Sequence, residues 1–297
     1  MPKVSICIPT FNQTKYLRKT LDSIFEQDYL DYEVIISDDS TEDDVFTLVE
    51  SYGLRGHKIK YYKNNVSLGS PENWNNAVEK ATGEYIKIIH HDDWFTTNES
   101  LGLFVSLFEN NDKLSFVFSG SKISDPTGKI RHHQMTDFQF DFLSNNLSSI
   151  FRANLIGAPS AVMYKRDLNL KFDKELKWLV DIEFYFQILK KGVLFAFTPK
   201  HLIETFIPPE RITNSCYMNK YVEIPEHFYF MEKHKIHDYK NINYVVELCL
   251  KLDVLSVKDI RRCGYLGAVH PWVSALIFLK KGFVYKVYSK LIFKLKN

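Results

Sequence analysis

Three polar clusters, each directly after a short apolar run, contain the residue types that bind nucleotides and metal ions. They occupy residues 9–12 (PTFN), 37–40 (SDDS) and 90–94 (HHDDW). The first cluster offers a hydroxyl, an aromatic ring and an amide next to the start of the following helix, which suits a nucleobase or a diphosphate. The alternative is a turn at a strand end in which Asn12 or Thr14 caps that helix.

The two acidic clusters have the chemistry of complementary parts of one ligand site. In residues 37–40, one carboxylate is available to cap the next helix and the other to accept from a base N–H or a ribose hydroxyl. Residues 90–94 hold two carboxylates and two imidazoles, with no basic residue closer than Lys87. Burying such charge without a counterion is costly, so we expect a divalent cation there, Mg²⁺ or Mn²⁺ bridging phosphates. The alternative is a helix cap by Asp93 beside solvated histidines.

The elements that must position these clusters alternate between strand and helix. Apolar runs predict strands at residues 4–8, 33–37, 59–63, 85–89, 114–119, 160–165, 193–197 and 202–207. Apolar positions spaced three and four apart predict helices at residues 14–27, 43–52, 71–81, 101–109, 141–154 and 179–190. Repeated βα units favour a parallel, doubly wound sheet, and ligands bind at the carboxyl ends of its strands. The three clusters follow predicted strands at those ends.

The composition is that of a globular chain. Of 297 residues, 45% are apolar and 25% charged, and the net charge of +2 argues against a general nucleic-acid binder. Four scattered cysteines without a CxxC pair argue against a disulfide framework or structural zinc, and they fit a reducing compartment. No apolar run reaches the roughly 18 residues that span a bilayer, and the N-terminus does not fit a signal peptide. We therefore expect a cytoplasmic protein.

Two runs of sequence, VSICIPTFNQTKYLRKTLDSIFEQDYLDYEVIISDDST and NVSLGSPENWNNAVEKATGEYIKIIHHDDWF, resemble the family 2 glycosyltransferases. The likeness covers residues 3–119 closely and extends loosely to about residue 210. It implies the GT-A fold, an α/β architecture with a Rossmann-like, mostly parallel sheet flanked by helices. It also implies a nucleotide-sugar donor, a divalent metal ion, and inverting transfer by one direct displacement.

The resemblance implies roles for individual residues. Asp39 contacts the base, Asp92 holds the metal ion as the last acid of a DxD-type motif, and Asp181 is the general base that deprotonates the acceptor. The remaining donor-binding positions are Pro9, Thr10, Phe11, Asn12, Gly69, Asn75, His91 and Arg211. Glu183 is the alternative base, and capping of its helix is the alternative role of Asp181. A solvated loop charge is the alternative for Arg211.

Two positions depart from the family pattern. His90 replaces the first acid of the DxD motif, which puts its ribose contact in doubt. Trp74 stands where many members have an arginine, and Lys63 or Lys15 are the candidates to supply the missing cation. These departures leave open a non-catalytic nucleotide-sugar-binding scaffold subunit. A sugar nucleotidyltransferase is a further alternative, although we see no glycine-rich triphosphate loop.

We expect a GT-A catalytic domain in residues 1–220, in which residues 1–119 bind the nucleotide sugar and residues 120–220 bind the acceptor. A helical C-terminal extension follows in residues 221–297. Beyond Asp259 the chain has no acidic residue but eight basic ones: Arg261, Arg262, Lys280, Lys281, Lys286, Lys290, Lys294 and Lys296. Residues 284–295 form an apolar helical face beside three of these lysines, which predicts a basic amphipathic tail. The tail either binds an anionic membrane surface or packs on the catalytic domain.

The predicted function is transfer of a sugar from a UDP- or dTDP-linked donor to a glycan or lipid-linked acceptor in surface polysaccharide biosynthesis. The leaving group is stabilised by Mn²⁺ or Mg²⁺. The expected location is cytoplasmic and peripheral, on the inner face of the plasma membrane. No nucleic-acid partner is expected.

Overall fold

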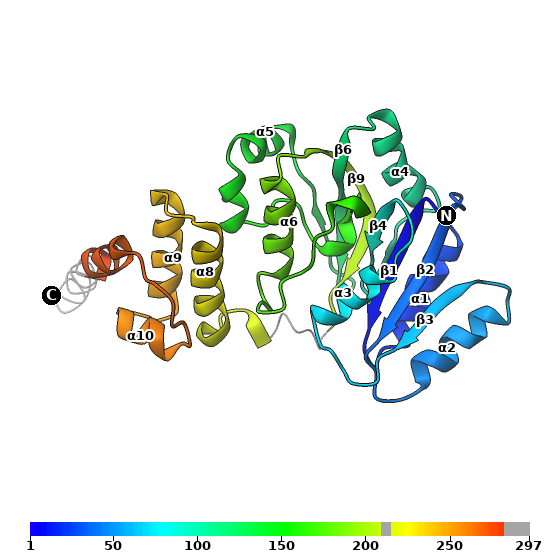
Figure 1. Ribbon diagram of the computed structural model, residues 1–297, viewed down its shortest axis with the longest axis horizontal. Helices are drawn as coiled ribbons and strands as arrows, with labels where there is room; N and C mark the ends of the chain where they lie inside the picture. Colours follow the sequence, from blue (N-terminus) through cyan, green and yellow to red (C-terminus); the bar gives the residue numbers. More distant parts are fainter. Residues whose placement is uncertain (209–214, 282–297) are drawn as a thin grey trace. The chain divides into compact units, whose positions relative to one another are not determined.

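The computed structural model describes residues 1–208 and 215–281 of the chain (Figure 1). The described residues form two compact units. The first comprises residues 1–175 and 180–208, and the second comprises 176–179 and 215–281. The division into two compact units does not show which residues bind the donor and which bind the acceptor. The predicted domain assignments therefore stay a prediction.

The first unit is built on a mixed sheet. Its strands lie side by side in the order β3 (Ile59–Lys63), β2 (Tyr32–Asp38), β1 (Val4–Thr10), β4 (Tyr85–Ile88), β8 (Val162–Lys165), β6 (Leu114–Ser124), β9 (Leu194–Phe206) and β5 (Asp93–Phe95), and β7 (Ile130–His133) pairs with β6. Among the described residues, β3, β2, β1, β4, β6 and β9 run in one direction, and β8, β5 and β7 run in the other. The mostly parallel sheet confirms the predicted α/β fold.

Helices flank this sheet (Figure 1). They are α1 (Lys15–Phe25), α2 (Asp44–Gly53), α3 (Glu72–Glu79), α4 (Ser100–Asn110), α5 (Asp137–Asn145) and α6 (Val180–Lys190), with 3₁₀ turns η1 (Leu147–Phe151), η2 (Pro159–Ala161) and η3 (Arg166–Leu168). The spacing of apolar residues explains how the helices pack. In α1, for example, Leu17, Leu21 and Ile24 lie on one face and are fully buried. Every residue of β1 is buried as well, as expected for a strand covered on both faces.

The structure differs from the sequence prediction at the later strands. β5 and β7 were not expected, and three strands run antiparallel to the rest. The two strands predicted at 193–197 and 202–207 are one strand, β9, which continues through Pro199. The register shifts by two residues there, between Ser119 and Gly120 of β6, so Pro199 lies in a bulge. Gly120 permits this, because a Cβ on it would lie 2.8 Å from the Pro199 carbonyl oxygen.

The predicted helix at 141–154 was also wrong in extent. Its place is taken by α5, which begins earlier at Asp137, and by η1. A capping box fixes that earlier start, because Thr136 and Gln139 bond each other's backbone N–H.

The second unit is helical, and the predicted extension over residues 221–297 stays a prediction. It contains α8 (Lys220–His234), α9 (Tyr239–Lys251) and α10 (Val257–Arg262). The Glu226 carboxylate accepts the backbone N–H groups of Lys177, Trp178 and Leu179, so residues 176–179 belong to this unit. None of the helices within the described ranges is both long and apolar enough to cross a membrane. The predicted amphipathic tail at 284–295 lies outside the described residues.

Candidate active site

The ends of β1 and β2 bring the first two polar clusters together. Thr10 is the register partner of Asp38, and the Asp39 N–H donates to the Thr10 carbonyl at 3.0 Å. The Asn12 N–H donates to Ser40 Oγ at 2.7 Å. Asn12 is left-handed (φ +46°), a conformation that asparagine tolerates. The predicted alternative, a cap by Asn12 or Thr14, is not observed: Thr14 makes no side-chain cap, and Asn12 accepts from Thr41 instead.

The two adjacent carboxylates hold different segments of the chain. Asp38 is fully buried and accepts from the Ser40 N–H at 2.9 Å and from the Tyr61 hydroxyl at 2.6 Å. Asp39 accepts from the Asn64 amide at 2.6 Å and from the Leu68 and Gly69 N–H groups. The helix-cap role considered for this pair is absent, since α2 has no side-chain cap.

The loop held by Asp39 forms one wall of a cavity. Gly69 has φ +74°, which only glycine adopts readily, and its N–H reaches Asp39 Oδ2 at 2.7 Å. The cavity has a volume of about 420 Å³ and is lined by Tyr62, Lys63, Asn64, Asn65, Val66, Leu68, Asn76 and Lys80. Asn64 therefore links the cavity directly to Asp39.

Two residues of the first cluster offer unused binding capacity. The Thr10 hydroxyl is buried and has no hydrogen-bond partner within the described residues. A buried polar group in this state costs about 1–3 kcal/mol, so a ligand that pairs with it gains affinity. The Phe11 ring is 50% exposed at the same strand end and offers a flat apolar surface.

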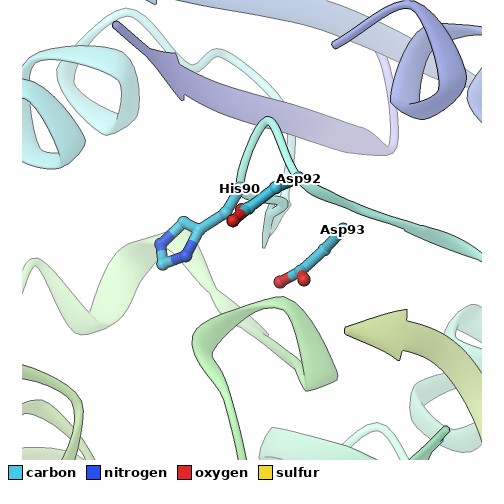
Figure 2. Close-up of side chains that lie close together, drawn as sticks. All are labelled: His90, Asp92 and Asp93. Carbon is cyan, nitrogen blue, oxygen red and sulfur yellow. The ribbon is translucent and has the colours of Figure 1, made fainter. Parts of the chain in front are cut away.

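The third cluster converges on one point (Figure 2). His90, Asp92 and Asp93 each offer a ligand atom, and these atoms lie within 4.8 Å of one another. Asp93 is the first residue of β5 and is buried, so the alternative of a helix cap by Asp93 is wrong. One imidazole and two carboxylates fit a divalent cation such as Mn²⁺ or Mg²⁺.

The alternative of two solvated histidines is not what the structure has. Burial lowers the pKa of His91, and the ring bonds to the backbone of Pro9. His91 therefore ties the third cluster to Pro9 of the first cluster, at the end of β1. The His90 ring packs on Trp74, with the ring centroids 4.4 Å apart.

Side chains of α1 and η2 bond the backbone of the third cluster, and Lys87 of β4 bonds η2 in turn. The Thr20 hydroxyl of α1 lies 3.0 Å from the His91 carbonyl oxygen and 2.8 Å from that of Asp93. The Ser160 hydroxyl of η2 accepts the His90 N–H at 3.0 Å. Lys87 of β4 is fully buried and donates to the carbonyl groups of Ser160 and Val162. Burial lowers the pKa of Lys87 well below its usual value.

The residues that depart from the family pattern contact one another. Trp74 touches His90, and its other neighbour is Phe172, whose ring meets it edge-on at 5.2 Å. Asn75 bonds both the N–H and the carbonyl of Phe172, at 2.8 and 2.9 Å, so its donor contact stays a prediction. Of the compensating cations considered, Lys63 lies 3.6 Å from Asp38 and also contacts Asp43.

The predicted general base lies in the first turn of α6. Asp181 Oδ2 accepts from the Asn154 amide at 2.8 Å, and Oδ1 accepts the Ile182 N–H at 2.8 Å. Burial raises the pKa of Asp181 to about 6, although these hydrogen bonds oppose the shift. A carboxylate with that pKa is ionised at neutral pH yet more basic than an ordinary aspartate. The alternative base, Glu183, is fully buried and bonds Gln187 at 2.6 Å.

Some site residues had no clear sequence signal. Asn154, Thr20 and Ser160 are polar residues of ordinary type, and their partners are distant in the sequence. Asn154 three residues before Gly157 is a turn signal, but a turn signal does not reveal which helix the turn faces. Arg211, one of the predicted donor-binding residues, lies outside the described residues.

The Glycosyl transferase family 2 model matches residues 5–172 of the chain, which include the three polar clusters. The chain belongs to this family. Membership of this family confirms the resemblance found in the sequence, and it supports a glycosyltransferase enzyme over the nucleotidyltransferase alternative. The scaffold subunit stays an alternative.

Two curated relatives are named as a glucosyltransferase and a glycosyltransferase. The chain is 31% identical over 169 residues to the GalNAc(5)-diNAcBac-PP-undecaprenol beta-1,3-glucosyltransferase of Campylobacter jejuni, with 52% of this chain and 53% of that protein aligned. The chain thus spans about half the length of this relative. An uncharacterized glycosyltransferase of Rickettsia prowazekii is 24% identical over 297 residues, covering 97% of this chain and 83% of the relative.

Solved structures share the fold. S. aureus TarS in complex with UDP-GlcNAc superimposes with a TM-score of 0.64 at 19% identity, over 84% of this chain and 72% of that one. A mannosyltransferase from Pyrobaculum calidifontis, in complex with GDP-Man and Mn²⁺, has a TM-score of 0.61 at 16% identity, over 98% and 83% of the two chains. At such identities the likeness establishes the GT-A fold, and the ligands belong to those proteins.

Proposed function

We propose that this glycosyltransferase moves a sugar, with inversion, from a UDP- or dTDP-linked donor to a hydroxyl of a glycan or lipid-linked acceptor in surface polysaccharide biosynthesis. The observation that carries the proposal is the meeting of the three clusters at one edge of the sheet. His91 bonds Pro9, and Asp39 bonds Thr10, so the nucleotide-type loops and the carboxylate cluster are neighbours.

The donor nucleotide is assigned to the ends of β1 and β2. The Thr10 hydroxyl and the exposed Phe11 ring are available to it, and Asn12 shapes the turn. A carboxylate has about four acceptor positions, and three N–H donors use some of those on Asp39, which leaves room for one base N–H. Gly69 and Asn75 are the other donor-binding residues of the proposal. The Gly69 N–H bonds Asp39, and the Asn75 amide bonds the backbone of Phe172.

The metal ion is assigned to Asp92, with His90 and Asp93 beside it. A divalent cation there supplies neutralisation of the charge on the nucleoside diphosphate leaving group. The imidazole among the ligands favours Mn²⁺ over Mg²⁺, which prefers an all-oxygen shell.

The general base is assigned to Asp181. The acceptor oxygen forms a bond to the anomeric carbon while the bond from that carbon to the phosphate oxygen breaks. The electron pair leaves with the nucleoside diphosphate, and the acceptor proton passes to the Asp181 carboxylate. Asp181 suits this role better than Glu183, because Asp181 is partly accessible and Glu183 is not.

A peripheral position on the inner face of the plasma membrane also belongs to the proposal. The Campylobacter jejuni relative is named as acting on an undecaprenol-linked acceptor, and such an acceptor resides in a bilayer. In this chain, Trp272, Phe278 and Leu279 are exposed near Lys281. Exposed aromatic and leucine side chains beside lysines suit an anionic membrane interface.

Calorimetric titration with UDP, dTDP, GDP and CDP, each with and without Mn²⁺, tests the donor and metal assignments. We expect Mn²⁺-dependent binding of UDP or dTDP by the parent chain. In Asp92→Ala we expect this metal-dependent binding to fall at least about 10-fold, the lower end of the effect of disturbing a metal site. Binding of the same nucleotide by Asp92→Ala, as tightly as by the parent with Mn²⁺ present, would mean that the metal site is wrongly placed.

A further inference from the structure

The side-chain amide of Asn154 bonds two segments that are far apart in the sequence. Its oxygen accepts the Ile156 N–H at 3.1 Å and the Gly157 N–H at 2.8 Å, which closes a tight turn. Its nitrogen donates to the Gly157 carbonyl at 3.0 Å and to Asp181 Oδ2 at 2.8 Å. One amide therefore shapes the turn at 154–157 and also holds the carboxylate in the first turn of α6.

The turn itself is anchored independently of Asp181. The buried Tyr185, one helical turn further along α6, donates its hydroxyl to the Gly157 carbonyl at 3.1 Å. Gly157 has φ +109°, which a side chain rarely permits, and a Cβ there would lie 3.2 Å from the His133 ring. His133 Nε2 in turn lies 3.2 Å from the Leu155 carbonyl oxygen. The turn is thus fixed by β7 and by α6.

We propose that Asn154 is a positioning residue, which holds the Asp181 carboxylate in the orientation that meets the acceptor hydroxyl. The inference rests on the proposed function of Asp181 as general base. The Ile182 N–H binds Oδ1, so Asn154 is the side chain that fixes the other oxygen. Orientation matters because a displacement of about 1 Å at a reacting group costs up to about 10²-fold in rate.

Asn154 also acts on the basicity of Asp181. Its hydrogen bond favours the ionised form and lowers the pKa, against the larger opposing effect of burial. On α6, Tyr185 lies close enough to Asp181 to interact with it electrostatically, and Glu183 is two residues further along the chain. The turn η1, which packs against α6, carries no titratable side chain but is followed by Arg152. His133 approaches the turn from β7. The side chain that donates to Asp181 Oδ2 is the Asn154 amide.

The variant Asn154→Asp separates the two uses of the amide. An aspartate keeps an oxygen that accepts the Ile156 and Gly157 N–H groups, so the turn is preserved. It removes the N–H donor and places a second carboxylate where the amide lay, 2.8 Å from Asp181 Oδ2. Two such carboxylates share a proton, which raises one of the two apparent pKa values strongly.

We expect the acid limb of the kcat profile of the full chain to move up by at least about one pH unit in Asn154→Asp, with kcat at pH 7 falling about 10-fold or more. The KM for the donor and the Mn²⁺-dependent nucleotide affinity should stay at the parental values. Tyr185→Phe is the matched control, because it removes a hydrogen bond to the same turn and none to Asp181, and its acid limb should stay in place.

An Asn154→Asp enzyme with the parental kcat and acid limb would overturn the inference, as would equal shifts in both variants. If Asn154→Asp does not fold, Asn154→Ser replaces it, because serine keeps a short acceptor for the turn but does not reach Asp181. For that variant an acid limb moved up and a lower kcat support the inference, and parental values overturn it. Asp181→Asn separates the two hypotheses: if it retains turnover, the base assignment itself fails.

Discussion

The raised pKa of Asp181 leads to a quantitative prediction for the pH dependence of transfer. The carboxyl titrates at about 6 instead of the usual 3.8, because burial disfavours its ionised form. If the ionised form is the base, kcat follows its fraction. That fraction is about a tenth at pH 5 and about nine-tenths at pH 7. An unperturbed aspartate would be about nine-tenths ionised at pH 5 and almost fully ionised at pH 7, so the two cases differ about 10-fold at pH 5.

The same shift predicts a cost in stability. A folded-state pKa above the unfolded value means that the folded state is favoured below about pH 4 and loses stability as the pH rises through about 6. The shift of about two units corresponds to about 2–3 kcal/mol at pH 8. Asp181→Asn removes the charge, so we expect it to be more stable than the parent at pH 8 by up to this amount. Near pH 4 the difference should disappear.

Two assays on the same proteins test this reasoning. Steady-state kcat at saturating donor and Mn²⁺ is measured from pH 5 to 8, and urea unfolding is measured at pH 4 and 8. We expect the parent to lose about 90% of its kcat at pH 5. We expect Asp181→Asn to lose about 10²- to 10⁴-fold in kcat while gaining stability at pH 8. A parental kcat that is equal at pH 5 and 7, or an Asp181→Asn variant that turns over normally, refutes the assignment.

Two further predictions concern Trp74 and the C-terminal surface. In a double-mutant cycle with Trp74→Ala and His90→Ala, the aromatic contact at 4.4 Å should give a coupling of about 0.5–1.5 kcal/mol in urea unfolding, and additive effects would show that the two residues are independent. The Phe278→Ser/Leu279→Ser variant should bind anionic vesicles less than the parent in co-sedimentation. Leu54→Ser, at a position that is 91% exposed, is the control that should bind as the parent does. Equal binding by all three chains would contradict the membrane proposal.

Local signals predicted the first half of the fold well. The strands around residues 4, 33, 59 and 85 and the intervening helices were all found near their predicted bounds. In this region each buried strand is a continuous apolar run, and each helix has one apolar face. The spacing of apolar residues therefore predicts which residues are buried and in which kind of element. The polar clusters were also locatable, because strand ends in a parallel sheet form one edge.

The second half was harder because its order depends on contacts between distant segments. β5 has three residues, too few to show a period, and its pairing with β9 joins Asp93 to Thr205. The sequence predicts a break between two strands around Pro199, but a bulge opposite Gly120 carries β9 through it. Lys87 lies inside a buried strand, and its ammonium is accommodated by groups distant in the sequence, among them the carbonyl groups of Ser160 and Val162.

The same limit applies to the chemistry of the site. A residue-by-residue comparison with the family pattern finds two separate departures: Trp74 in place of an arginine and His90 in place of an acid. Because the two rings are in contact, they form one coupled replacement. The family pattern has one cation and one anion at these two positions, whereas this chain has two aromatic rings in contact. We therefore expect a single change, Trp74→Arg or His90→Asp, to alter Mn²⁺-dependent nucleotide binding more than the two changes made together.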